Sequence, residues 1–355
     1  MGIIISILVL SFLIFFHELG HFLAARYFGV KVEVFSIGFG KAVVKKVIGE
    51  TEYRLSAIPL GGYVKMKGQD DIDPMNIDTS SGSYATKHPL KRIIILFAGS
   101  FFNILLAFLL YIAIGLLGER TLAPTIGELS ENMPAQTAGL KSGDEIVAIN
   151  NNPIKSWDDL SEHIKDSEGT LDFQIKRDER FHNYSIEPIL SDSKNIFQED
   201  VKRKLIGIAP SGDVVTIHHS VFEAIPFALE KTIEASRLIV LGVQKLIQGI
   251  VPVDQVGGVI SIVQVTSSAA DIGIVALFTL TALISVNLGI LNLLPIPALD
   301  GGHILFTIYE LITKRKPSEN VLYKLTIFGW VVLFGLMFLG LYNDINRLAN
   351  PTPIP

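Results

Sequence analysis

The sequence of 355 residues contains no cysteine, and charged residues make up only 18% of it. The absence of cysteine excludes a disulfide framework, thiolate metal ligands and thiol redox chemistry. Hydrophobic residues make up 49%, and the mean hydropathy is +0.44, which excludes a soluble, disordered or fibrous protein. The formal net charge is −5, so the sequence has no basic excess and is not expected to bind nucleic acid.

Four uncharged runs are long enough to cross a lipid bilayer, so the sequence predicts an α-helical integral membrane protein. The expected transmembrane helices are residues 1–28, 93–118, 272–299 and 325–343. The first lacks a basic start and a small-residue cleavage site, so we expect it to be retained rather than removed as a signal peptide. A shorter uncharged run at residues 255–270 contains two adjacent glycines, and we expect it to lie at the interface or to re-enter the membrane.

The distribution of basic residues predicts the orientation of these spans. Lysine and arginine crowd the loop at residues 29–92 and the loop at 300–324, so both loops should be cytoplasmic. Residues 119–271 are more acidic and should lie outside the cytoplasm. The tail at 344–355 should lie on that same outer side.

Three segments between the spans have distinct patterns. Residues 31–67 alternate polar and apolar side chains, and glycines that include Gly61 and Gly62 interrupt them, which predicts a sheet of β-hairpins beside the membrane. Residues 69–83 are acidic and rich in turn formers, which favours a mobile connector. Residues 221–250 carry apolar side chains at helical spacing, which predicts an amphipathic helix on the outer membrane surface.

Residues 119–190 have the pattern of a small α+β domain, with short β-like runs and a polar helix expected at 157–165. Residues 138–150, AGLKSGDEIVAIN, resemble the signature of PDZ domains, in which a Gly-Asp turn leads into a buried strand. PDZ domains bind extended peptides by strand addition, so the resemblance implies peptide contact outside the cytoplasm. The alternative is another small β-rich domain with a Gly-Asp turn. Residues 191–271 are expected to be a linker followed by the amphipathic helix.

The first hydrophobic run leads into the motif His17-Glu18-Leu19-Gly20-His21. The two imidazoles lie one helical turn apart on one face, a spacing that suits a single metal ion. Glu18 lies beside them, where a carboxylate could take a proton from an activated water. Ionisable groups cost about 2.5–3.5 kcal/mol in the middle of a span, which favours a functional role. The alternative is a helix end with two histidines and a solvated glutamate.

A catalytic zinc site needs three protein ligands, so a third must come from elsewhere in the chain. Asp300 is the best candidate because Pro295 and Pro297 interrupt the preceding helix, which could turn the carboxylate inward. The alternative is that Asp300 only caps the helix that follows it. His303 is a rival ligand.

Taken together, these motifs resemble the site-2 protease family of intramembrane zinc metalloproteases, and most closely its RseP-type regulators of envelope stress signalling. The resemblance rests on HExxH in the first span, NxxPxPxxDG at residues 292–301 and the PDZ-like insertion. Residues 29–40 and 59–66 also match, the latter resembling the family's membrane-associated hairpin. The chain departs from the family by carrying Ser100 where proline is common, and by having one PDZ-like region where well-known relatives have two.

The resemblance implies a role for each matching residue. His17, His21 and Asp300 would hold Zn²⁺, and Glu18 would be the general base. Asn103, in the GxxxN pattern of the second span, would lie near the active site and steady the oxyanion or the substrate backbone. The remaining matches would contact unwound substrate, and they are Asn287, Asn292, Pro295, Pro297, Gly61 and Gly62. For each asparagine the alternative is an interhelical hydrogen bond that only packs the bundle.

The implied function is intramembrane proteolysis in the bacterial cytoplasmic membrane. Single-pass membrane proteins, such as anti-sigma factors or signal-peptide remnants, would be cut within or near their transmembrane segment, while the PDZ-like domain filters substrates by size or recruits peptides. One alternative is a non-catalytic PDZ-bearing membrane adaptor, against which the intact Glu18 counts. Another is a small transporter, although no inverted repeat is visible.

Overall fold

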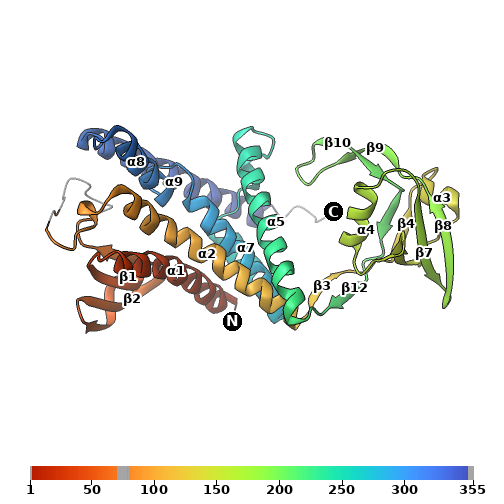
Figure 1. Ribbon diagram of the computed structural model, residues 1–355, viewed down its shortest axis with the longest axis horizontal. Helices are drawn as coiled ribbons and strands as arrows, with labels where there is room; N and C mark the ends of the chain where they lie inside the picture. The colour runs from red at the N-terminus through yellow and green to blue at the C-terminus, as the bar shows by residue number, and fades with distance from the viewer. Residues whose placement is uncertain (1, 70–77, 79, 351–355) are drawn as a thin grey trace. The chain divides into compact units, whose positions relative to one another are not determined.

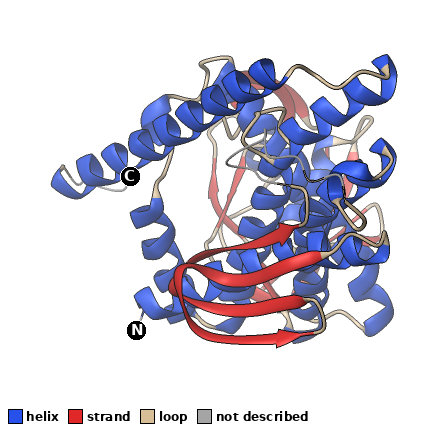
Figure 2. Ribbon diagram, turned by 90° about the vertical axis from the view of Figure 1, so that its left-hand side faces the viewer, coloured by secondary structure: helices blue, strands red, loops and turns tan. Residues whose placement is uncertain are grey.

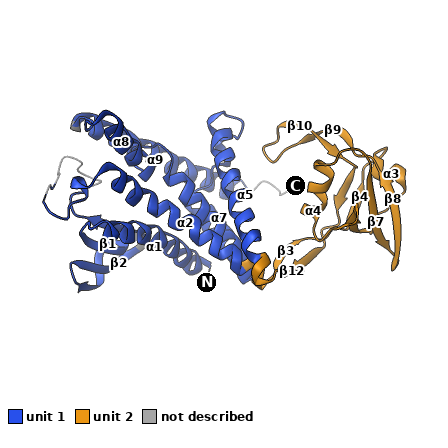
Figure 3. Ribbon diagram, viewed as in Figure 1, with its two compact units in different colours: residues 1–113, 224–355 blue, residues 114–223 orange. Residues whose placement is uncertain are grey.

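A computed structural model of the chain describes residues 2–69, 78 and 80–350 (Figure 1). The connector expected at residues 69–83 and the tail expected at 344–355 therefore fall partly outside the described residues. The chain divides into two compact units, coloured separately in Figure 3. The helical unit comprises Met1–Ala113 and Ala224–Pro355, and the inserted unit comprises Ile114–Glu223.

Four helices of the described chain are long and apolar enough to cross a membrane, as predicted. They are α1 (Gly2–Tyr27), α2 (Pro89–Leu117), α7 (Ile274–Asn292) and α9 (Glu319–Ala349). Many large apolar side chains on these helices remain exposed, for example Phe328 at 60%. Because lipid covers such side chains without needing polar partners, the exposed apolar surface agrees with a multi-pass membrane protein.

Helix α7 ends at Asn292, seven residues before the end of the third span that the sequence predicts. The loop that follows contains Pro295 and Pro297, which remove two backbone donors and cannot continue a helix. A new helix, α8 (Asp300–Thr313), begins directly after this loop. The break therefore turns one long apolar stretch into two helices that meet at a sharp corner.

Two further helices complete the unit, α5 (Val221–Ile247) and α6 (Val259–Ile272), with short 3₁₀ turns at Tyr84–Thr86 and Val253–Gln255. Helix α5 lies where the sequence predicts an amphipathic helix. With 14 residues, α6 is about 21 Å long and does not span a hydrocarbon core of about 30 Å on its own. The buried carboxylate of Asp344 on α9 accepts hydrogen bonds from backbone N–H groups at the start of α6. These bonds hold the first turn of α6 against α9.

The predicted hairpin region is an antiparallel pair, β1 (Val32–Ile48) and β2 (Thr51–Met66), seen in front in Figure 2. Both strands bend, so residues 32–37 pair with 62–66 on one side and with 52–55 on the other. Phe35 packs edge-on against Phe22 of α1, with ring centroids 5.2 Å apart, and both side chains are buried. This contact fixes the sheet against the helix that carries the HExxH motif.

The inserted unit is built around a four-stranded antiparallel sheet with the order β6-β5-β7-β8. A core of buried aliphatic side chains and Phe173 lies between this sheet and α4. The helix expected at residues 157–165 is α4. The elements are β3 (Glu119–Leu122), β4 (Ile126–Leu129), α3 (Pro134–Ala138), β5 (Glu145–Ile149), β6 (Asn152–Pro153), α4 (Trp157–Lys165), β7 (Leu171–Arg177) and β8 (Arg180–Ile186).

This unit continues past residue 190, the end that the sequence pattern predicts, to Glu223. Four more strands follow, β9 (Ile189–Lys194), β10 (Asp200–Leu205), β11 (Ile208–Pro210) and β12 (Val214–Ile217). Strands β9 and β10 pair with each other, β11 pairs with β4, and β12 pairs with β3. The segment expected to be a linker therefore closes the unit, because its last strands satisfy the backbone groups of the first ones.

A buried ion pair stabilises the inserted unit at its Gly-Asp turn. Asp144 is fully buried, and Arg177 donates to both of its carboxylate oxygens at 2.6 Å. The hydrogen bond with Asp144 raises the pKa of Arg177, so the guanidinium stays charged. Because Asp144→Ala removes the carboxylate that pairs with the guanidinium, we expect it to lower the free energy of unfolding of this unit by about 3 kcal/mol.

The fluorescence of Trp157 during denaturant unfolding measures this effect in a Trp330→Phe background, since the chain has only two tryptophans. The matched control is Asp200→Ala, which removes an exposed ion pair with Lys194 and is expected to have little effect. Equal stability of the two variants would contradict a stabilising role for the Asp144 pair.

Candidate metal centre

Two glycines bring α1 and α2 into close contact at the level of the HExxH motif. A Cβ on Gly20 would lie 2.3 Å from the backbone oxygen of Ala98, and a Cβ on Gly99 would lie 2.3 Å from Nε2 of His21. Small residues allow helix backbones in membranes to approach closely, so any larger residue would separate the helices. The glycine-lined crossing places α2 directly against the two imidazoles.

His17 and His21 come from successive turns of α1, and their Nε2 atoms lie 3.2 Å apart. Both side chains are nearly buried, at 12% and 8% exposed. Nδ1 of His21 lies 2.9 Å from the backbone oxygen of Ile95 on α2. When Nδ1 carries the proton and donates to this oxygen, the lone pair of Nε2 is available to a metal ion.

Asp300 is the first residue of α8, and the preceding loop turns its side chain toward the imidazoles. A Cβ on Gly301 would lie 2.3 Å from the backbone oxygen of Leu293, and one on Gly302 would lie equally close to that of Ile296. The two glycines therefore let the loop fold tightly onto the start of α8. The Asp300 carboxylate makes no capping bond to this helix, whose N-cap is Leu299.

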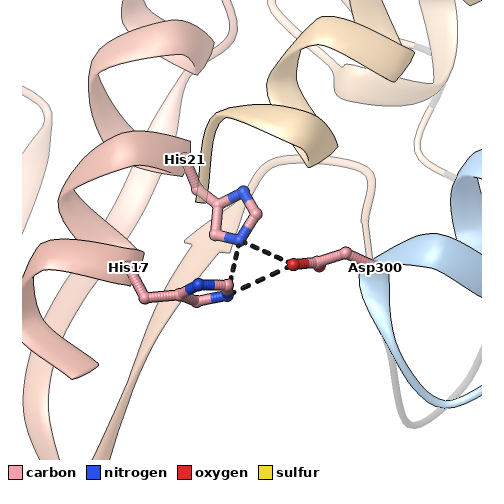
Figure 4. Close-up of side chains that lie close together, drawn as sticks. All are labelled: His17, His21 and Asp300. Atoms are coloured by element: carbon pink, nitrogen blue, oxygen red, sulfur yellow. Dashed lines mark hydrogen bonds and ion pairs between the residues drawn. The ribbon is translucent and has the colours of Figure 1, made fainter. Parts of the chain in front are cut away.

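Oδ2 of Asp300 completes a triangle with the two Nε2 atoms, 3.2 Å from that of His17 and 3.3 Å from that of His21 (Figure 4). In tetrahedral zinc sites with bonds of about 2.0 Å, neighbouring ligand atoms lie about 3.3 Å apart. Oδ2 is buried, and no donor within the described residues hydrogen-bonds to it. Two nitrogens, one oxygen and an open fourth position are the donor set of a catalytic zinc site, so these residues fit zinc.

Within the part of the chain that the structure describes, this is the one group of histidine and acidic side chains with metal-ligand spacing. His303, the rival ligand, lies outside the group, and its ring contacts Phe306 on the same helix.

Glu18 lies on α1 beside the first of the two histidines and is half-buried. Its Cγ atom is 3.4 Å from the position that a Cβ on Gly62 would occupy, so β2 passes directly beside it. A Cβ on Gly61 would lie 1.9 Å from Cε2 of Phe39, and φ there is +147°, so glycine is favoured at this position too. Residues 62–66 pair with 32–37 on one side, and no described strand pairs with their other edge.

Two of the three asparagines singled out by the sequence lie next to His17. Nδ2 of Asn103, on α2, is 3.3 Å from His17 Nδ1, and Nδ2 of Asn292, at the end of α7, is 3.4 Å from His17 Nε2. Asn287 lies on α7 and is half-buried, and its side chain makes no hydrogen bond to the described residues. Pro295 and Pro297 lie in the corner between α7 and α8.

Sequence reasoning missed two groups at the site. The backbone oxygen of Ile95 faces His21, and the hydroxyl of Ser285 donates to the backbone oxygen of Asn103 at 2.7 Å. A backbone oxygen has no signature in a sequence, and a serine in an apolar helix has many possible partners.

The sequence matches the model of Peptidase family M50 over residues 5–336. Two relatives carry the name "Putative zinc metalloprotease". One from Campylobacter jejuni is 47% identical over 345 residues, covering 97% of this chain and 93% of the relative. One from Helicobacter pylori strain J99 is 43% identical over 355 residues, covering 97% and 99%. The regulator of sigma-W protease of Bacillus subtilis is 28% identical over 425 residues, covering 98% of each chain.

Proposed function

The chain belongs to peptidase family M50, the site-2 protease family, and is a zinc metalloprotease of the membrane, and we propose that it cleaves single-pass membrane proteins within or near their transmembrane segments. One observation carries the proposal. The three ligand atoms of His17, His21 and Asp300 lie 3.2–3.3 Å apart, and two of them belong to a helix that is long and apolar enough to span a bilayer.

In this proposal, Nε2 of His17, Nε2 of His21 and Oδ2 of Asp300 hold the zinc ion. When bound, zinc would supply Lewis acidity for the attacking water and the substrate carbonyl. Glu18 takes the proton from the attacking water and delivers it to the leaving amine, as a general base and then a general acid. The burial of the two imidazoles keeps their geometry fixed while the bond is broken.

A transmembrane helix has all of its backbone groups paired, so the substrate must unwind locally before its peptide bond is accessible. We assign the edge of β2 at residues 62–66, with which no described strand pairs, to the capture of the unwound segment as an added strand. Glu18 lies beside this edge, because its Cγ is 3.4 Å from the position that a Cβ on Gly62 would occupy. Asn292, whose Nδ2 lies 3.4 Å from His17 Nε2, and the loop with Pro295 and Pro297 would contact the same segment.

The orientation of the chain follows from its basic residues. Lys87 and Lys91 precede the apolar part of α2, and Lys314 follows α8, so we place the metal centre near the cytoplasmic side. The inserted unit then lies outside the cytoplasm. There it would act as a PDZ-like domain that binds peptide or excludes substrates with bulky outer domains.

The substrate class is narrowed by a relative. The Bacillus subtilis protein carries the name "Regulator of sigma-W protease". We therefore propose an anti-sigma factor as the first substrate to test, with signal-peptide remnants as the second.

Zinc removal tests the proposed function. The purified protein in detergent should cut a model transmembrane segment, lose this activity when a chelator removes its zinc, and regain it with about one equivalent of Zn²⁺ but not with Mg²⁺. Mg²⁺ prefers six oxygen ligands, which two imidazoles do not supply. Full activity in a sample shown by elemental analysis to contain no metal would contradict the proposal.

A further inference from the structure

Asn103 is held rigidly beside His17. It follows Gly99 by one turn of α2, and its side chain is fully buried. Its backbone oxygen accepts a hydrogen bond from Ser285 of α7, which fixes this turn of α2 against α7. The amide nitrogen lies 3.3 Å from His17 Nδ1, whereas the amide oxygen has no partner among the described residues.

The contact between Asn103 and His17 depends on which ring nitrogen of His17 carries the proton. A neutral imidazole that binds a metal through Nε2 carries its proton on Nδ1, so Nδ1 of His17 becomes a donor and needs an acceptor. His21 has such an acceptor in the backbone oxygen of Ile95. For His17 the group at hydrogen-bond distance from Nδ1 is the Asn103 amide. An amide NH₂ cannot accept a hydrogen bond, but the oxygen at the other end of the same group can.

We propose that Asn103 presents its oxygen to the Nδ1–H of His17 and is thereby a positioning residue for this zinc ligand. A half-turn about the Cβ–Cγ bond exchanges the two ends of the amide, which are nearly equal in size. In the present orientation two donors would face each other across 3.3 Å when zinc is bound, and the buried oxygen would have no partner. After the half-turn the oxygen and Nδ1–H pair with each other.

The inference rests on the zinc site proposed above and differs from the role that the family resemblance implies for Asn103. Steadying an oxyanion uses the NH₂ group as a donor, whereas orienting His17 uses the oxygen as an acceptor. The carboxamide of Asn103 thus takes the place that a backbone oxygen takes for His21. Outer partners of this kind fix the tautomer and the ring orientation of a histidine ligand, and they raise metal affinity about 10–100-fold.

Two substitutions separate the two roles. Asn103→Leu keeps a similar volume but has no acceptor, and we expect it to bind zinc about 10–100-fold more weakly than the wild type. Asn103→Asp keeps the acceptor but has no NH₂ donor, and we expect it to bind zinc at least as tightly as the wild type. The dissociation constant is measured on the full-length protein in detergent, by competition for Zn²⁺ with a chromophoric chelator.

The matched control is Thr281→Val, which removes a buried hydroxyl of α7 that bonds only within its own helix, and it should leave zinc affinity unchanged. The inference is overturned if Asn103→Leu binds zinc like the wild type, or if Asn103→Asp binds it as weakly as Asn103→Leu does. Should Asn103→Leu fail to fold, a weakened Asn103→Asp overturns the inference by itself. Absence of zinc binding by the wild type would instead remove the proposed function, so the two failures are distinguishable.

Discussion

Replacing Glu18 with glutamine is expected to reduce cleavage of a transmembrane substrate by on the order of 10²–10⁴-fold while zinc remains bound. Glutamine has nearly the size of glutamate, but its amide does not take up the proton released by the attacking water. Glu18 contributes none of the three atoms that form the ligand triangle, so the metal site should survive the change. Zinc content and initial cleavage rates of the same purified samples measure the two effects separately.

The matched control for this variant is Glu50→Gln, which alters an exposed carboxylate between β1 and β2. It should cleave at the wild-type rate. Equal rates for wild type and Glu18→Gln would remove Glu18 from the mechanism. If zinc were lost together with activity, Glu18 would belong to the metal ligands instead of acting as the base.

Asp300→Ala is expected to abolish both zinc binding and cleavage. Two imidazoles alone leave half of a tetrahedral coordination sphere without protein ligands, and the lost carboxylate also supplies the only negative charge of the ligand set. We expect zinc affinity to fall by more than the roughly 100-fold that loss of an outer partner costs. The chelator competition used for Asn103 measures the affinity, and cleavage is followed in parallel.

A change elsewhere on α8 separates ligand loss from displacement of the helix. Thr307→Val removes a buried hydroxyl that bonds back to His303 within α8, and it should retain zinc and activity. If Asp300→Ala retained wild-type zinc occupancy and wild-type cleavage, Asp300 would not be a ligand, and the triangle would reflect packing alone.

The elements that sequence analysis predicts well are those with a strong local signal. The four long apolar helices follow from hydropathy, and α4 follows from its own periodicity, with the same bounds as expected. The pair β1 and β2 follows from the alternation of residues 31–67. His17 and His21 share a face because residues four apart always do so in a helix.

The remaining features depend on contacts between distant residues, which a local pattern does not contain. Pro295 and Pro297 made Asp300 the candidate third ligand, and the family resemblance favoured it, but no local pattern shows that its carboxylate meets two imidazoles of the first helix. The hydrogen bond from His21 to the backbone of Ile95 depends on how two helices cross at Gly20 and Gly99.

The end of the inserted unit was missed for a different reason. Strands β11 and β12 have only three and four residues, which is too short for a period of two to be recognised. They form because β4 and β3 offer unpaired edges to them.

The pairing of β3 with β12 has a consequence for how this architecture changes over time. Glu119 lies opposite Ile217 and Leu122 opposite Val214, so the outgoing and returning chains run side by side, about 5 Å apart. Residues 123–213 therefore form an insertion whose first and last residues are adjacent. Because the two ends of this segment lie close together, a shorter turn, a different domain or a tandem copy of the domain could join them without changing the helical unit. The peptidase and its accessory part are therefore free to diverge at separate rates.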